Sequence, residues 1–114
     1  MGPRMTAPRF DELIHPSTRL SLAATLAAAD WVDFAYLKDA LSLSDSALSK
    51  QLSILEHAGY VTTERRLDGS RHKVHASLTE AGRAAFDGHV AALRAIVEGP
   101  QHEGVSRGAA KAGR

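Results

Sequence analysis

The sequence predicts one small, mainly helical domain that carries a single β-hairpin. Alanine, the best helix former, supplies 20 of the 114 residues. Apolar residues recur at spacings of three and four over most of the chain, whereas between residues 61 and 78 the pattern changes to alternation around Asp68-Gly69-Ser70. The length fits one domain, with residues 10–98 forming the folded part.

Composition excludes several classes of protein. The chain has no cysteine, which excludes disulfides, thiolate metal sites and a cysteine nucleophile. No apolar run approaches the ~18–20 residues of a membrane span, and the N-terminus lacks the apolar stretch of a signal peptide. The sequence contains no glycine-rich phosphate loop. It also contains no paired carboxylates and no nucleophile–base set at a recognisable spacing. We therefore expect a cytoplasmic protein that is not an enzyme and binds no cofactor.

Both ends differ from the middle of the chain. Residues 1–9 contain two prolines, a glycine and two arginines, and we expect a flexible arm. Residues 99–114 contain four glycines and almost no large apolar side chain. Such a segment buries too little surface to offset its ordering entropy, so we expect a disordered tail.

The first half of the domain predicts three helices. The apolar residues at 10, 13 and 14 indicate a short first helix that stops near His15-Pro16, because a residue before proline avoids the helical region. A second helix is expected over about 17–29. After an extended stub at residues 31–33, Asp33 is placed to cap a third helix over 34–41.

The second half predicts a helix, a hairpin and a last helix. Ser44 is a good N-cap for a fourth helix over 44–58, and Gly59 suits its C-terminus. The hairpin covers 61–78 and turns at Asp68-Gly69-Ser70. Thr79 is expected to cap the last helix, which runs to about 98 and ends at Gly99-Pro100.

The third and fourth helices are joined by so short a connection that they must cross at a steep angle, as in a helix-turn-helix. On the fourth helix, the leucines share one face, and the opposite face carries short polar side chains with one lysine. Such a low-relief surface suits a DNA groove, where serine and lysine bond phosphates or base edges. An ordinary solvated face is the alternative. The outward residues are Ser46, Ser49, Lys50, Ser53 and His57.

The hairpin concentrates positive charge in an otherwise nearly neutral domain, whose whole chain has a net charge of +1. Cations on a β-ribbon can reach a minor groove or the flanking phosphates. Charges also protect ordinary hairpins from pairing at their edges. The basic side chains are Arg65, Arg66, Arg71 and Lys73, with His72 and His75 beside them and only Glu64 and Asp68 opposing them.

Residues 10–98 resemble a winged helix-turn-helix of the MarR/ArsR type, and especially the small MarR-like regulators. The combination of several short stretches carries the resemblance. They are His15-Pro16-Ser17-Thr18-Arg19-Leu20, Val32-Asp33-Phe34-Ala35-Tyr36-Leu37, Leu43-Ser44-Asp45, Leu48-Ser49-Lys50-Gln51-Leu52, Leu55-Glu56-His57-Ala58-Gly59-Tyr60-Val61 and Leu78-Thr79-Glu80-Ala81-Gly82-Arg83.

This resemblance implies a homodimeric transcription regulator that binds double-stranded DNA. The helix at 44–58 would enter the major groove, and the wing at 61–78 would touch the minor groove or backbone. Two departures stand out: Ser46 and Ala47 occupy positions where larger hydrogen-bonding side chains are frequent, and the wing is short. The implied DNA-binding residues are Ser44, Ser46, Ala47, Ser49, Lys50, Ser53, Arg65, Arg66, Arg71, His72 and Lys73.

The two terminal helices are expected to form a two-fold dimer interface. The last helix carries a heptad-like apolar seam, and the first helix brings a second apolar stripe. A dimer would present its two recognition helices about 34–36 Å apart and bind a pseudo-palindromic site. The interface residues are Phe10, Leu13, Ile14, Phe86, Val90, Leu93, Ile96 and Val97.

The sequence allows two further interpretations. Asp87-Gly88-His89 with His102-Glu103 is similar to the last-helix metal site of ArsR-type sensors, but Gly99-Pro100 breaks the helix between the two halves, so we expect no metal. A winged helix can also serve as a protein-interaction module without specific DNA binding. The target sequence, any small-molecule effector and the direction of regulation are not encoded in these patterns.

Overall fold

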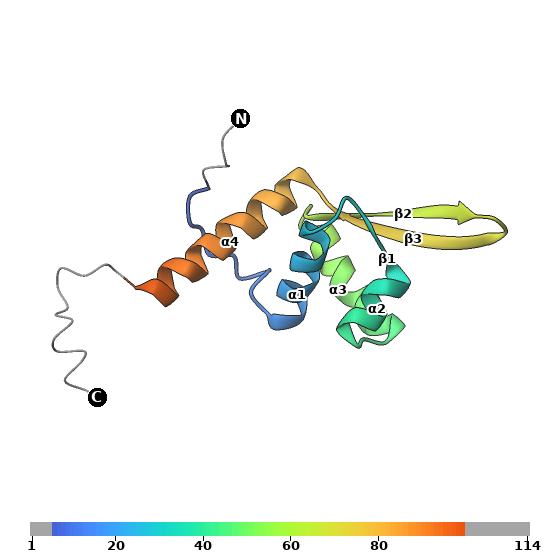
Figure 1. Cartoon of the computed structure of the whole chain (residues 1–114), viewed down its shortest axis with the longest axis horizontal. Coiled ribbons are helices and arrows are strands. Elements are labelled where there is room, and N and C mark those ends of the chain that lie inside the picture. The colour runs from blue at the N-terminus through green and yellow to red at the C-terminus, as the bar shows by residue number, and fades with distance from the viewer. Residues whose placement is uncertain (1–5, 100–114) are drawn as a thin grey trace.

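The structure is a computed structural model and describes residues 6–99. That part contains four helices and a three-stranded sheet, which confirms the mainly helical fold with a hairpin wing. Figure 1 shows α1, α2 and α3 gathered together, with α4 and the β2–β3 hairpin extending to opposite sides. In chain order the elements are α1 (Ser17–Ala27), β1 (Val32–Asp33), α2 (Phe34–Leu41), α3 (Asp45–His57), β2 (Val61–Asp68), β3 (Arg71–Leu78) and α4 (Glu80–Glu98).

The sheet is antiparallel, in the order β1-β3-β2. β2 pairs with β3 along its whole length, from Val61 opposite Leu78 to Asp68 opposite Arg71. The two-residue strand β1 pairs only with the base of β3. Eight residues of strand extend roughly 25 Å, and the hairpin projects well beyond the helices (Figure 1). The two strands fill the predicted bounds of the wing, 61–78.

The hydrophobic core lies between α1, α2, α3 and the base of the sheet. Each helix contributes its leucines from one face, and the sheet contributes only residues near the helices. Burying one such side chain stabilises the fold by about 1.5–3 kcal/mol, so these contacts fix how α3 is held. The buried cluster comprises Leu22, Leu26, Val32, Leu37, Leu48, Leu52, Leu55, Val61, Ala76 and Leu78.

The connection between α2 and α3 is as short as predicted. Ser42 ends α2 in the left-handed conformation, with a φ of 55°. The backbone N–H of Leu43 then donates to the Lys38 carbonyl oxygen at 3.0 Å. Ser44 is the N-cap of α3, and its hydroxyl oxygen accepts a hydrogen bond from the Ala47 N–H at 3.1 Å. These local bonds set the sharp turn of the helix-turn-helix.

The predicted first helix over residues 10–14 does not form. A single turn takes its place, because the Asp11 carbonyl oxygen accepts from the amides of Ile14 and His15 at 3.2 and 3.0 Å. The Asp11 carboxylate also caps this turn, since Oδ1 accepts from the Ile14 N–H at 3.2 Å. Pro16 follows at once and disfavours a helical residue before it. The fold consequently has a helix at only one of its ends.

Asp33 stands at the N-cap position of α2, as expected, but its side chain does not bond the helix amides. The pairing of β1 with β3 sets Asp33 opposite His75 instead. Its Oδ1 lies 3.0 Å from Nε2 of His75. The His75 ring also stacks on the Trp31 indole, with 3.8 Å between ring centroids. Tertiary pairing therefore overrides the predicted cap.

α4 begins and ends where the sequence predicts. The Thr79 hydroxyl accepts from the Gly82 N–H at 2.9 Å, which caps the N-terminus, and Gly99 ends the helix with a φ of 71°. Within residues 6–99, no helix is long and apolar enough to cross a membrane. The expected flexible arm lies mostly, and the expected tail almost entirely, outside that range.

Candidate nucleic-acid interface

The outward face of α3 is a polar surface open to solvent. Its leucines point into the core, and the opposite side is left exposed by the other residues of the range 6–99. Lys50 forms no ion pair with any residue in the described range and is available to an external anion. The exposed residues of the predicted set are Ser44, Ser46, Ser49, Lys50 and Ser53, while Ala47 is half-buried.

Two of these positions have local partners. The Ser44 hydroxyl is occupied as a helix cap and lies 3.4 Å from the Ser46 hydroxyl. His57, one turn after Ser53, places Nδ1 2.9 Å from the Ser53 carbonyl oxygen. A carbonyl only accepts, so Nδ1 carries the proton and Nε2 is left as an acceptor. His57 therefore extends the polar face of α3 by a turn.

Polar bonds hold α3 on both sides. Arg19 of α1 donates from Nη1 to Oε1 of Gln51 at 2.8 Å. Lys38 of α2 lies 2.9 Å from Oδ1 of Asp45 in the first turn of α3. The hydrogen bond to Asp45, together with its charge, raises the pKa of Lys38. Gln51 is a positioning contact that the sequence alone does not single out.

The cations of the wing fall into two groups. Arg66 lies 3.5 Å from Glu64, and Lys73 lies 3.2 Å from Asp68, so both are partly neutralised. Arg65 and Arg71 also lie on the exposed hairpin, but neither is in an ion pair with another described residue. The free positive charge of the wing is thus concentrated on these two arginines.

The strand register places the wing residues on two faces. Opposite residues in an antiparallel pair share a face, and Arg65 pairs with Val74, while Leu67 pairs with His72. Thr63 shares that face by alternation and donates to Oε2 of Glu56 on α3 at 2.9 Å. Arg65 and His72 therefore lie on the face that continues toward α3. The other face carries Arg66, Arg71 and Lys73.

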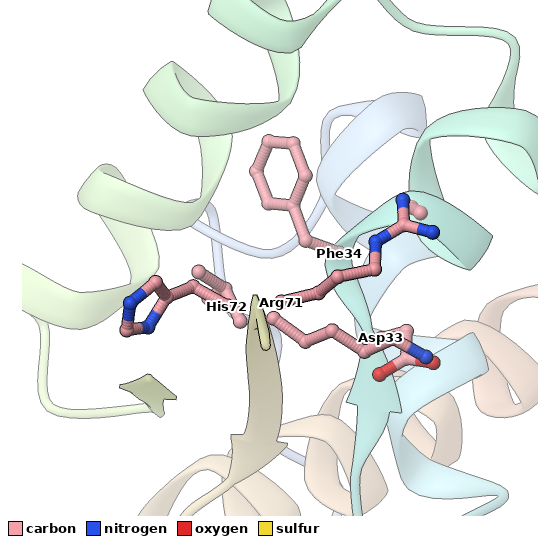
Figure 2. Close-up of a pocket in the computed structure, with 7 residues that line it drawn as sticks. Asp33, Phe34, Arg71 and His72 are labelled. Carbon is pink, nitrogen blue, oxygen red and sulfur yellow. The ribbon is translucent and has the colours of Figure 1, made fainter. Parts of the chain in front are cut away.

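A pocket of about 280 Å³ lies where the outer part of β3 meets the start of α2. Figure 2 shows the Arg71 side chain extending beside Phe34, while the His72 ring points to the opposite side of the strand. The pocket exists because β1 leaves the sheet after two residues. Its lining residues are Asp33, Phe34, Ala35, Arg71, His72, Lys73 and Val74.

The predicted dimer residues differ in exposure. Ile96 and Val97, in the last turns of α4, are 66% and 83% exposed. Ile14 is only 1% exposed and packs inside the protomer. The others are exposed or half-buried: Phe10, Leu13, Phe86, Val90 and Leu93.

His89, considered above for a metal site, is buried in α4 instead. Its Nδ1 accepts a hydrogen bond from the Asp11 N–H at 2.9 Å, and its Nε2 lies 3.2 Å from Nδ1 of His15. An Nδ1 that accepts leaves the proton on Nε2, which makes Nε2 a donor and not a metal ligand. His102 lies outside the described range. In the sequence, the helical spacing of His89 from Gly82 and Ala92 places all three on one face of the helix, which indicates that His89 is buried.

A helix-turn-helix with an exposed polar second helix, followed by a cationic hairpin, defines the winged helix-turn-helix class. The model of the winged helix DNA-binding domain family matches residues 18–97. The chain therefore belongs to the winged helix DNA-binding domain family. An uncharacterized protein of Methanocaldococcus jannaschii is 30% identical over 79 residues, which are 69% of this chain and 86% of the relative.

Solved structures share this fold. A transcriptional regulator homologue from Pyrococcus horikoshii matches with a TM-score of 0.74 at 20% identity, over 81% of this chain and 91% of that one. ZitR of Lactococcus lactis, a zinc-responsive MarR family member, matches with a TM-score of 0.59 at 22% identity, over 83% of this chain and 65% of that one. The predicted resemblance is confirmed at the level of the fold, since a MarR family member is among the structures that share it.

Proposed function

We propose that this protein is a sequence-specific, homodimeric transcription regulator that inserts α3 into the major groove of double-stranded DNA. The observation that carries the proposal is the exposed polar face of α3, with Lys50 free of ion pairs among the described residues, beside a wing with two free arginines. Serine hydroxyls and a lysine can lie flat against a groove wall and bond phosphates and base edges.

The wing would add contacts on one side of α3. Arg65 and Arg71 can reach the minor groove or the adjacent phosphates, because the hairpin projects beyond the helices (Figure 1). His72 lies on the same face of the wing as Arg65. We expect phosphate contacts to dominate the affinity, since few side chains on α3 are long enough for bidentate recognition of a base.

A second copy would dock on the exposed apolar end of α4. Ile96 and Val97 are large apolar side chains that no described residue covers, and exposed patches of this kind mark interaction sites. Phe10, which is 43% exposed, extends the apolar surface from the N-terminal segment. A two-fold dimer would pair two copies of α3 with the halves of a pseudo-palindromic site.

Selection of bound duplexes from a random pool tests this function directly. We expect enrichment of two related half-sites. Binding to a recovered duplex should weaken in Lys50→Ala, and the slope of log affinity against log salt should become shallower by about one. Lys38→Ala removes the same charge from a lysine that is paired with Asp45, and should change both quantities less.

Two results would refute this proposal. One is a failure to enrich any duplex, with affinity at low salt no higher than that of a control with scrambled charges. The other is recovery of a stoichiometric protein partner that survives nuclease and high salt, together with an unchanged salt slope in Lys50→Ala. That second result would identify a protein-interaction module.

A further inference from the structure

His89 is the only buried polar or charged side chain among the described residues, with no exposed surface. Its bonds fix its protonation state. Nδ1 accepts from the Asp11 N–H, so the ring proton resides on Nε2, and this N–H donates to Nδ1 of His15 at 3.2 Å. Both imidazoles must therefore be neutral where they face each other.

An additional proton on either ring removes one of these bonds. A proton on Nδ1 of His89 would face the Asp11 N–H, and a proton on Nδ1 of His15 would face the Nε2–H of His89. Burial lowers the pKa of His89, and the positive charge of a protonated His15 lowers it further, whereas the Asp11 carboxylate opposes both effects. The neutral pair is the form that this packing stabilises.

Among the described residues, the groups that contact the pair include no acceptor for a charged ring other than those of Asp11. Phe10 packs against both imidazoles, with 4.7 Å between ring centroids in each case. The Asp11 carboxylate is the nearest anion, but Oδ2 already accepts from the Tyr60 hydroxyl at 2.6 Å, and Oδ1 accepts from backbone amides. Protonation would therefore leave buried N–H groups without partners, which is costly.

The same bonds hold the N-terminal segment, residues 9–15, against α4 and indirectly support α3. At one end, the Arg9 N–H donates to the Gly88 carbonyl oxygen at 2.9 Å. At the other, the Leu13 carbonyl oxygen accepts from Nε of Arg19 at 2.6 Å. Arg19 uses its Nη1 to bond Gln51 of α3. A continuous set of hydrogen bonds thus joins α4, the N-terminal segment and the recognition helix.

We propose that the His15–His89 pair is a proton-responsive clasp that holds residues 9–15 on α4 at neutral pH and releases them in mild acid. Release would remove the Leu13 support of Arg19 and weaken duplex binding. The duplex step rests on the proposed function, whereas the clasp itself does not.

The sign of the pH dependence follows from the neutral pair. In the held state burial lowers the pKa of His89 below the ordinary histidine value of 6.5, so His89 takes up a proton more readily once the segment is released. The clasp is therefore intact above that pH and is lost progressively as the pH falls below it. The charged and titratable groups that face the pair are Asp11 and, through its bond to Asp11, Tyr60, whose hydroxyl is also influenced by the charge of Arg9.

Deuterium exchange of the free full-length chain tests the clasp without DNA. In the wild type we expect the protection of the Asp11 amide, corrected for intrinsic rate, to fall about tenfold between about pH 7 and pH 5.5. His89→Asn is the matched variant, since its Oδ1 can accept from the same amide and does not titrate. Its protection should be independent of pH. Constant protection in the wild type, or an equal loss in His89→Asn, would overturn the proposal.

His15→Asn is a second variant for the case that His89→Asn, which changes a buried residue, does not fold. His15 lies at the surface, so its replacement leaves the fold intact. An Asn oxygen can still accept from His89, so the loss of protection should remain but move to lower pH. A loss at the same pH as in the wild type would remove His15 from the clasp.

Duplex binding is measured separately. Between the same two pH values, wild-type affinity for a recovered duplex should fall at least about threefold relative to His89→Asn, and an equal pH dependence would contradict the coupling to α3. If no duplex binds at any pH, the proposed function fails, while the exchange result still decides the clasp.

Discussion

Gly82 packs directly against the backbone of Tyr60, so closely that a Cβ at position 82 would overlap the Tyr60 carbonyl oxygen. That oxygen also accepts a hydrogen bond from the Thr79 N–H at 2.9 Å, and the Thr79 hydroxyl donates to the Gly59 carbonyl oxygen at 2.6 Å. The first turn of α4 is thereby fixed to the chain just after α3. The angle between the two helices depends on glycine at position 82, because any side chain there would force the backbones apart.

Gly82→Ala should lower the free energy of unfolding by about 1–3 kcal/mol, because backbone must shift to admit the methyl group. Gly88→Ala is the control. It lies on the same helix, where a Cβ would meet its nearest atoms at ordinary contact distance, 3.5 Å or more. Alanine is the better helix former by about 1 kcal/mol, so Gly88→Ala should be neutral or stabilising. Urea denaturation of both variants makes the comparison, and equal destabilisation would contradict the packing argument.

The wing arginines should differ in their effect on DNA binding. Arg65→Ala and Arg71→Ala remove cations that are free of ion pairs within the described part of the chain. Arg66→Ala removes a cation paired with Glu64, and Lys73→Ala removes one paired with Asp68. We expect the first two variants each to lower affinity for a recovered duplex about threefold or more beyond the second two, with a shallower salt slope. Fluorescence anisotropy over a salt series measures both. Four equal losses would mean that the ion pairs open on binding.

Tyr60→Phe should destabilise the fold through the loss of one charged hydrogen bond. The Tyr60 hydroxyl donates to Oδ2 of Asp11, and because the bond is partly solvated we expect a loss of about 1 kcal/mol at neutral pH. This bond, then burial, raise the pKa of Tyr60 above its ordinary value of 10.0. The stability difference between wild type and variant should therefore persist below pH 10 and disappear as the pH rises through the raised pKa.

Denaturation curves at several pH values measure this difference. Tyr36→Phe is the control, since the Tyr36 side chain is 59% exposed. It should change stability by less than about 0.5 kcal/mol. A Tyr60→Phe protein as stable as the wild type would show that the bond to Asp11 does not hold the N-terminal segment.

Val97→Asp should shift the protein toward the monomer. The side chain is exposed in the single chain, so the substitution leaves the protomer folded while placing a charge in the proposed apolar interface, where an unpaired charge is costly. Light scattering after size exclusion reports the mass, and circular dichroism reports the fold. Val97→Met preserves the apolar character and should remain dimeric. An unchanged mass in Val97→Asp would exclude the end of α4 from the interface.

Local signals in the sequence were sufficient for the helix-turn-helix and for most boundaries. Ser44 and Thr79 are predictable as caps because a cap involves residues two or three apart. Gly69 is predictable in the hairpin turn because a turn, too, involves only neighbouring residues. The helix expected over residues 10–14 was wrong, because its apolar spacing does not reveal that the Asp11 carboxylate closes a single turn instead.

Features that depend on distant residues were not visible in the sequence. His89 meets Asp11 across 78 positions, and Tyr60 meets Asp11 across 49. No spacing rule connects such partners, and the same holds for Arg19 with Gln51. The two faces of the wing also required the strand register, since a shift by one residue would exchange them.

The fixed contact between Gly82 and Tyr60 has a consequence for the layout of a target site. If α4 forms the dimer axis, this contact holds the two copies of α3 at one rotational phase around the duplex. Inserting one base pair between the half-sites turns one of them by about 34–36° around the duplex axis. Affinity should consequently fall with the first inserted pairs and recover only when a full helical turn has been added, provided that the second α3 can still reach.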